Sequence, residues 1–182
     1  MLKHAAIVWA LILVAQPALS EDMGLYLGYQ GGSYWLNGEF SHGGTRRSDS
    51  GRAHGPYAGY RFHRYGAVEV QHLYQKETDE RITYEGEVTV VSLRPTLPVN
   101  EKWEFYGKLG WAWIDGDLGL TANSFPGERA ESVAKNVPLF GLGTRWAMWG
   151  LHARVEFQFD GSTLRGEATD IGLYTLGVEY VF

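Results

Sequence analysis

The chain has 182 residues, a formal net charge of -5 and a mean hydropathy of -0.24. These values exclude a bundle of membrane-spanning helices, and they give no argument for a nucleic-acid partner. Because the sequence contains no cysteine, its stability cannot come from disulfides and must come from a core or a sheet that closes on itself. Its 24 glycines and 14% aromatic residues favour β-structure with small side chains on one face and bulky ones on the other.

The first twenty residues have the pattern of a secretory signal peptide. A basic residue precedes the apolar run 5–15, Pro17 ends that run, and Ala18 and Ser20 supply the small residues of a cleavage site. A transmembrane anchor is the alternative, but the run is shorter than the roughly 18 apolar residues that a spanning helix needs. We therefore expect residues 1–20 to be removed and residues 21–182 to form a single exported domain.

After residue 20 the sequence alternates with a period of two, and the helical period of 3.6 is not seen. In the segment 67–74, for example, Val68, Val70, His72 and Tyr74 share one face of a strand. Most of the alternating runs have about the 9–11 residues of a tilted membrane-spanning β-strand. Eight runs are predicted as strands: 23–33, 55–62, 65–74, 87–97, 103–113, 137–147, 151–159 and 171–182.

The connections between these runs alternate in length. Short ones at 63–64, 98–102 and 148–150 separate longer polar ones, and both termini lie on the short side. This rhythm predicts an all-β fold, an eight-stranded antiparallel up-and-down barrel whose long connections all emerge at one end. The predicted long connections are 34–54, 75–86, 114–136 and 160–170.

The polar face of the strands decides between two kinds of barrel. A soluble barrel holds its apolar face inside and needs an exterior rich in charged residues, whereas an outer-membrane barrel turns the apolar face to lipid. Here the polar face is mostly glycine and alanine with isolated charges of both signs, which suits a narrow interior. We therefore predict a transmembrane β-barrel with an interior charge network of four cations and three anions: Glu69, Arg94, Lys108, Arg145, Arg154, Glu156 and Glu179.

Aromatic residues lie near the ends of the predicted strands on the apolar face. Rings of this kind favour the boundary between lipid and water, where two aromatic girdles are expected. A soluble aromatic core is the alternative interpretation. The residues assigned to the lipid-facing girdles are Tyr57, Tyr74, Trp103, Phe105, Trp111, Trp113, Trp146, Phe159, Tyr180 and Phe182.

The last strand ends on an aromatic residue, with apolar or aromatic residues at every second position before it. Phe182, Tyr180, Val178 and Leu176 share one face, and Phe182 would lie in a girdle if this strand closed the barrel against the first. This pattern resembles the C-terminal assembly signal of bacterial outer-membrane barrels.

Several strands also resemble the eight-stranded transmembrane domain of the OmpA family: "GPYAGYRF…YGAVEVQHLY", "LPVNEKWEFYGKLGWAW", "VPLFGLGTRWAM" and "ARVEFQF". The resemblance covers most of the chain after residue 20, but the long connections match nothing recognised. It implies an interior network of Glu, Lys and Arg that plugs the lumen, with Glu69, Arg94 and Arg154 in it. Arg145 stands where the family has an acidic residue, so the pairing must differ here. The family's separate peptidoglycan-binding domain has no counterpart, and anchoring to the cell wall is not implied.

Small outer-membrane barrels include lipid-modifying enzymes, in which a histidine would act as the base. His72 has no evident serine partner on a strand, and Arg154 stands where the lipid A deacylase pattern would place a serine after His152. His42 and His54 have no recognised metal-ligand spacing. The sequence therefore predicts neither a catalytic residue nor a metal or cofactor site.

These observations predict a small integral protein of a Gram-negative outer membrane, with a structural or adhesive role and at most weak pore activity. The expected partners are outer-membrane lipid, lipopolysaccharide and the barrel assembly machinery. Arg46, Arg47 and Arg52 are either contacts to lipopolysaccharide phosphates or, as the favoured alternative, solvated charges of the connection. We expect a monomer and leave the extracellular partners open. The alternatives are a lipid-modifying barrel enzyme and a soluble exported ligand-binding barrel.

Overall fold

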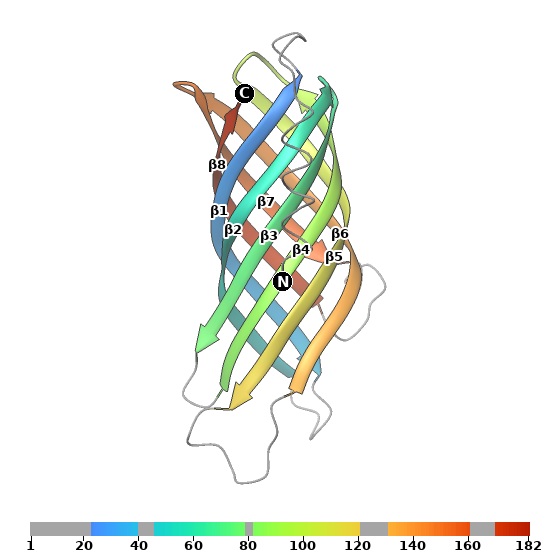
Figure 1. Ribbon diagram of the computed structural model, residues 1–182, viewed down its shortest axis with the longest axis vertical. Coiled ribbons are helices and arrows are strands. Elements are labelled where there is room, and N and C mark those ends of the chain that lie inside the picture. Colours follow the sequence, from blue (N-terminus) through green and yellow to red (C-terminus); the bar gives the residue numbers. More distant parts are fainter. Residues whose placement is uncertain (1–22, 40–45, 79–81, 121–130, 161–169) are drawn as a thin grey trace, which may run out of the picture.

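The structure is a computed structural model and describes residues 23–39, 46–78, 82–120, 131–160 and 170–182. Antiparallel strands paired in chain order form one closed barrel, as predicted (Figure 1). None of the described residues belongs to a helix long and apolar enough to cross a membrane. The strands are β1 Gly24–Glu39, β2 Arg46–His63, β3 Gly66–Thr78, β4 Ile82–Pro98, β5 Trp103–Leu120, β6 Glu131–Met148, β7 Leu151–Asp160 and β8 Asp170–Val181.

The strands are tilted and staggered around the barrel (Figure 1). When the paired residues are followed once around from Leu25 on β1, the path returns to β1 at Trp35, ten residues nearer the end with the long connections. A stagger of ten residues over eight strands tilts them by roughly 40° and leaves an interior just wide enough for side chains. The path runs through Leu25, Tyr60, Val68, Leu93, Leu109, Phe140, Phe159, Gly172 and Trp35.

The strands extend further than the sequence analysis predicts. The β1–β2 ladder continues to the pair Glu39 and Arg46, and the β5–β6 ladder to Leu118 and Glu131, so most of the predicted connections 34–54 and 114–136 is strand. The prediction of long connections here is wrong because the loss of apolar alternation does not mark the end of a strand. An antiparallel hairpin keeps pairing its backbone where its side chains meet water, so that change marks the lipid boundary instead.

At the opposite end the connections are short. β6 and β7 are joined by Trp149 and Gly150, which have φ values of 46° and 82°. Positive φ at both central residues is the signature of a type I′ turn, which matches the twist of an antiparallel hairpin. Glycine adopts this conformation readily, whereas Trp149 adopts it at some cost.

Side chains alternate between the outside and the lumen along every strand. On β4, for example, Val91 and Leu93 face outward while Val90 and Ser92 are buried. The exterior is a band of exposed apolar and aromatic side chains, which is the face that meets lipid in a transmembrane barrel. Of the ten predicted girdle residues, nine face outward and Tyr57 does not. Tyr57 lies in the lumen because it shares its face with Gly59 and Arg61, and the stretch "GPYAGYRF" has aromatic residues on both faces.

The barrel closes by pairing of β8 with β1. The pairs run from Tyr26 and Val181 to Asn37 and Asp170, and the backbone N–H of Phe182 donates a hydrogen bond to the carbonyl of Leu25 at 2.9 Å. The Phe182 side chain is 67% exposed on the outer wall. Closure leaves no strand edge unpaired, which lipid would not tolerate.

Inside the barrel, large tyrosine rings lie on glycines of the neighbouring strand. Tyr26 is paired with Gly59 and Tyr106 with Gly143. A Cβ atom added at Gly59 would lie 2.2 Å from the Tyr26 ring, and one at Gly143 would lie 2.3 Å from the Tyr106 ring. These glycines therefore provide the space that each ring occupies within the narrow lumen.

This packing predicts that Gly59→Ala destabilises the barrel, because the new methyl group overlaps the Tyr26 ring. Overpacking of this kind costs about 1–3 kcal/mol. The matched control is Gly31→Ala on the outer face of β1, where the nearest atom is the Cβ of His54 at 3.6 Å. Urea unfolding of the refolded proteins should show a lower midpoint for Gly59→Ala than for Gly31→Ala. Equal midpoints would contradict the proposed role of the glycine.

Candidate functional site in the barrel lumen

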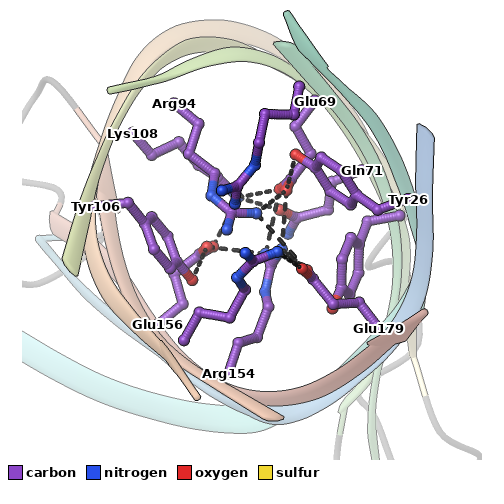
Figure 2. Close-up of polar contacts among 12 residues, drawn as sticks. Tyr26, Glu69, Gln71, Arg94, Tyr106, Lys108, Arg154, Glu156 and Glu179 are labelled. Atoms are coloured by element: carbon purple, nitrogen blue, oxygen red, sulfur yellow. Dashed lines mark hydrogen bonds and ion pairs between the residues drawn. The ribbon is translucent and has the colours of Figure 1, made fainter. Parts of the chain in front are cut away.

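A cluster of charged side chains fills the half of the lumen near the short connections. The strands project them inward from all sides, so that they meet near the barrel axis (Figure 2). All seven residues that the sequence analysis assigned to the interior are buried in this region. We call this cluster the charge layer, and it includes two further residues: Arg61, Glu69, Arg94, Glu104, Lys108, Arg145, Arg154, Glu156 and Glu179.

Glu69 on β3 is the central acceptor of the charge layer. Its carboxylate accepts from Arg154 Nη1 at 2.8 Å and from Arg94 Nη1 at 3.2 Å, and it lies 2.8 Å from Lys108 Nζ. The Tyr26 hydroxyl adds a fourth donor at 2.9 Å. Because every side chain of these ion pairs is fully buried, the charges are held by one another and not by water.

Two more carboxylates are shared between cations. Glu156 accepts from Lys108 Nζ at 2.7 Å and from Arg154 Nη2 at 2.8 Å. Glu179 accepts from Arg145 Nη1 at 2.6 Å. Lys108 and Arg154 therefore each bridge Glu69 and Glu156, so the removal of one cation leaves two carboxylates with fewer partners.

The sequence analysis missed Arg61 and Glu104. Glu104 accepts from Arg61 Nη2 at 2.8 Å, from Arg94 Nη2 at 3.0 Å and from Arg145 Nη2 at 3.0 Å. It thus provides an acidic partner for Arg145, which itself stands where the family has an acidic residue. The alternation contained the signal, because Glu104 has the same parity as Lys108, and Arg61 the same as Gly59. With these two residues the charge layer holds five cations and four carboxylates.

Tyrosines that project inward from the strands bind the charged side chains of the charge layer. The Tyr106 hydroxyl donates to Glu156 at 2.9 Å, and the Tyr57 hydroxyl donates to Glu179 at 3.4 Å. The same rings carry arginines on their faces. The guanidinium carbon of Arg94 lies 4.1 Å from the centre of the Tyr106 ring, and that of Arg154 lies 3.8 Å from the centre of the Tyr57 ring. Each arginine is therefore fixed by carboxylates and by an aromatic face.

Three glutamines, Gln30, Gln71 and Gln158, form the next level toward the long connections. Gln30 Oε1 accepts from Arg154 at 2.9 Å, and Gln71 Oε1 accepts from Lys108 Nζ at 2.8 Å. Gln158 Nε2 donates to Gln71 Oε1 at 3.0 Å. Gln30 and Gln71 thus provide neutral acceptors for Arg154 and Lys108.

Beyond the glutamines most inward side chains are apolar, and the buried carboxylate of Asp160, which is paired with Leu139, lies among them. On each contributing strand the apolar residues come after the charged or amide residue in the direction of the long connection, as Leu73 follows Gln71 and Val90 lies beyond Ser92. We call this cluster the apolar plug: Tyr34, Ala53, Leu73, Val88, Val90, Ala112, Val137, Leu139 and Leu173. The lumen is therefore closed at two successive levels, one charged and one apolar.

The described residues contain no group of His, Cys, Asp and Glu suited to hold a metal ion. On the outer wall, however, His72 has two neighbours that the sequence analysis did not identify. Its Nδ1 lies 2.9 Å from Thr89 Oγ1, and its Nε2 lies 3.7 Å from Glu87. His42 lies outside the described residues, and His54 contacts the Tyr29 hydroxyl through Nδ1 at 2.7 Å.

The burial of the charge layer predicts a large difference between interior and exterior ion pairs. Arg154→Ala leaves Glu69 and Glu156 buried with fewer partners, which costs about 3–5 kcal/mol. Lys76→Ala is the matched control, because Lys76 also forms an ion pair, with Glu85, but its side chain is 68% exposed. This exposed pair is worth about 0–1 kcal/mol. Urea unfolding in detergent should therefore show a much lower midpoint for Arg154→Ala, and similar midpoints for both variants would contradict a buried network.

Comparison with known proteins agrees with this architecture. Among solved structures, the chain is similar to Ail, the attachment invasion locus protein of Yersinia pestis, with 16% identity, coverage of 88% of this chain and 100% of that one, and a TM-score of 0.59. It is also similar to Neisserial surface protein A, with 12% identity, coverage of 87% and 97%, and a TM-score of 0.65. OprG from Pseudomonas aeruginosa shows 13% identity, coverage of 88% and 97%, and a TM-score of 0.63.

At these identities the structural similarity establishes the fold alone. Sequence comparison with curated proteins finds no match. The OmpA-like transmembrane domain family, by contrast, matches residues 20–182, which is nearly all of the chain. Together with the closed barrel and its apolar exterior, this match shows that the chain belongs to the OmpA-like transmembrane domain family of outer-membrane β-barrel proteins.

Proposed function

We propose that the protein is a closed barrel of the outer membrane, with a structural or surface-interaction role and without transport or catalytic activity. The observation that carries this proposal is the doubly closed lumen. The charge layer fills one half with paired side chains, and the apolar plug fills the other. A lumen closed in this way leaves the outer wall and the ends of the hairpins as the surfaces through which the protein acts.

Export and lipid contact are part of the same proposal. Residues 1–20 lie outside the described residues, and we propose that they are a cleaved signal peptide. The barrel exterior would then contact outer-membrane lipid, including lipopolysaccharide. Ail has been solved with the heparin analogue sucrose octasulfate, and an anionic glycan partner for this chain would be consistent with that relative. Arg52 is exposed on the outer wall, whereas the side chains of Arg46 and Arg47 lie outside the described part.

Lipid modification is the second candidate function, and one observation favours it. Thr89, His72 and Glu87 lie together on the outer wall in the arrangement of a hydroxyl, a base and an acid. The first proposal is preferred because acyl transfer also needs free N–H donors for the oxyanion, and the amides around this cluster pair in the β3–β4 ladder. A threonine hydroxyl bonded to imidazole does not by itself make an active site.

The role can be tested by trimming the hairpins. In the trimmed variant, segments 37–48 and 117–132 are each replaced by an Asn-Gly turn, which keeps the pairs Leu36–Asp49 and Gly116–Val133 next to the turns. In a strain lacking the gene, the trimmed barrel should restore resistance to detergent and vancomycin if the role is structural. If the role is surface interaction, only the full chain should restore binding to host cells or glycans. A change in lipid A acylation that depends on His72 would instead support the enzyme.

The two levels of closure predict how conductance responds to substitution. In planar bilayers the unmodified barrel should show conductance near zero. Arg154→Ala should remain near zero because the apolar plug is intact, and the pair Leu73→Ser with Leu139→Ser should remain near zero because the charge layer is intact. The triple variant should conduct. A measurable pore in Arg154→Ala alone would show that the apolar plug does not block ions.

The C-terminal residues are proposed to act as the signal for the barrel assembly machinery. Deletion of Phe182 should lower the outer-membrane yield, because it removes an exposed ring and the hydrogen bond to Leu25. The control is Val181→Thr, a substitution of similar size at a residue that packs inward against the Tyr26 and Tyr57 cluster. Outer-membrane fractionation with heat-modifiability on gels measures the yield. Equal yields for the two variants would reject an assembly role for the outward face.

A further inference from the structure

The outer wall is polar on one side of the barrel, at a height where the other side is aromatic. On β2, β3 and β4, the outward side chains toward the long connections are His54, His72 and Thr89. On the opposite side, β7 and β8 carry aromatic rings near this level, with 4.7 Å between the ring centres of Phe157 and Tyr174. We call the first surface the polar wall, and its outward side chains are Arg52, His54, His72, Tyr74, Lys76, Glu85, Glu87 and Thr89.

In each histidine of the polar wall, only Nδ1 has a hydrogen-bond partner among the described residues of the barrel itself. Nδ1 of His54 is bonded to the Tyr29 hydroxyl at 2.7 Å, and Nδ1 of His72 to Thr89 at 2.9 Å. The described part of the chain offers no hydrogen-bond partner to Nε2 of His54, and Nε2 of His72 is 3.7 Å from Glu87. Lipid chains offer no hydrogen bonds, and ionisable side chains at membrane depth are costly unless they meet a polar partner.

Three charged side chains of the polar wall lie directly opposite one another on neighbouring strands. Arg52 on β2 is directly opposite Lys76 on β3, and Lys76 is directly opposite Glu85 on β4. Lys76 also forms an ion pair with Glu85. Arg52 is thus opposite a like charge, which is unfavourable within one barrel. With two cations and two carboxylates, the wall has no excess of positive charge to attract an anionic lipid head group.

The stagger of the barrel places opposite charges at matching heights on the two flanks of β3. Ten residues over eight strands correspond to a rise of 1.25 residues per strand, so Glu85 lies about 2.5 residues higher than Arg52. Glu87 is two residues lower than Glu85 on the descending strand β4, which brings it level with Arg52. By the same reasoning His54 is level with Thr89. Arg52 on β2 and Glu87 on β4 therefore lie at the same height on either side of β3.

We propose that the polar wall binds the polar wall of a second copy of this chain. A two-fold axis parallel to the barrel axis and facing β3 places β2 of each copy against β4 of the other, because such an interface pairs a residue on one flank with its counterpart on the opposite flank. Arg52 of each copy then meets Glu87 of the other at the same height. The dimer also replaces lipid by polar groups around His54 and His72.

This inference goes beyond the proposed function and differs from the sequence-based expectation of a monomer. The aromatic side of the barrel stays in contact with lipid, and the lumen is unaffected. A structural or surface role for the barrel therefore holds whether or not the dimer forms, so the two proposals fail independently.

The absence of cysteine allows a direct test by single-cysteine cross-linking in outer membranes. Val70→Cys lies on the outward face of β3, below the polar wall, and the control Leu142→Cys lies outward on β6, on the far side of the barrel at nearly the same height. Oxidation should give several-fold more disulfide-linked dimer for Val70→Cys. Heat-modifiability on gels verifies that both variants are folded. Equal or greater cross-linking through Leu142→Cys, or no dimer from either variant, would overturn the proposal.

Charge exchange in the Val70→Cys background distinguishes a second copy from an anionic lipid. Arg52→Glu and Glu87→Arg should each weaken dimerisation roughly tenfold, equivalent to about 1.4 kcal/mol, because each places like charges across the two-fold. The double variant should recover the original cross-linked fraction, since the exchanged charges again face each other. If Glu87→Arg strengthens cross-linking, or the double variant fails to recover it, the wall is not a self-complementary interface, and binding of an anionic lipid would replace the proposal.

Discussion

The structure depends on one constraint, which is that lipid offers no hydrogen bonds to backbone N–H and C=O groups. The pairing of β8 with β1 satisfies this constraint by removing the last two strand edges. Once eight strands close with a stagger of ten residues, the radius and the tilt are set, and so is the volume that interior side chains must fill. The distribution of glycines, tyrosines and charges in the lumen is a consequence of that fixed volume.

The charge layer fills this volume with groups that are individually unfavourable in a dry interior. Burial of an unpaired charge costs several kcal/mol, whereas a fully paired network roughly compensates its own desolvation. We interpret its benefit as specificity more than net stability. A slip of one residue on β4 would turn Arg94 toward lipid and Leu93 into the lumen, so the network and the apolar exterior both select the same register. The glycines beneath Tyr26 and Tyr106 make this selection stricter, because only one register brings each ring over a position without a side chain.

The sequence predicted the features that follow from alternation and missed those that depend on geometry across strands. The alternation of residues alone assigned Val155 to the lipid face and Arg154 to the lumen, and it predicted the barrel. It failed for Tyr57 because "GPYAGYRF" has aromatic residues of both parities, and only pairing with Gly28 shows which ring enters the lumen. Glu104 has the same parity as Lys108, so the alternation contained the signal that places it in the lumen. The partners of Arg145 and the Thr89 neighbour of His72 depend on register, which a single sequence does not specify.

The closed lumen and the polar side of the outer wall both indicate that the protein acts through its exterior. If the interior carried a solute path, polar residues would be expected around the axis for its whole length, but the apolar plug interrupts it. Several ionisable groups are instead placed on the exterior of β2, β3 and β4. Lipid would accept such groups on one side of a barrel only at a penalty that increases with depth. His54 and His72 lie at the boundary where these strands leave lipid, and the proposed contact with a second copy would give both rings polar neighbours there.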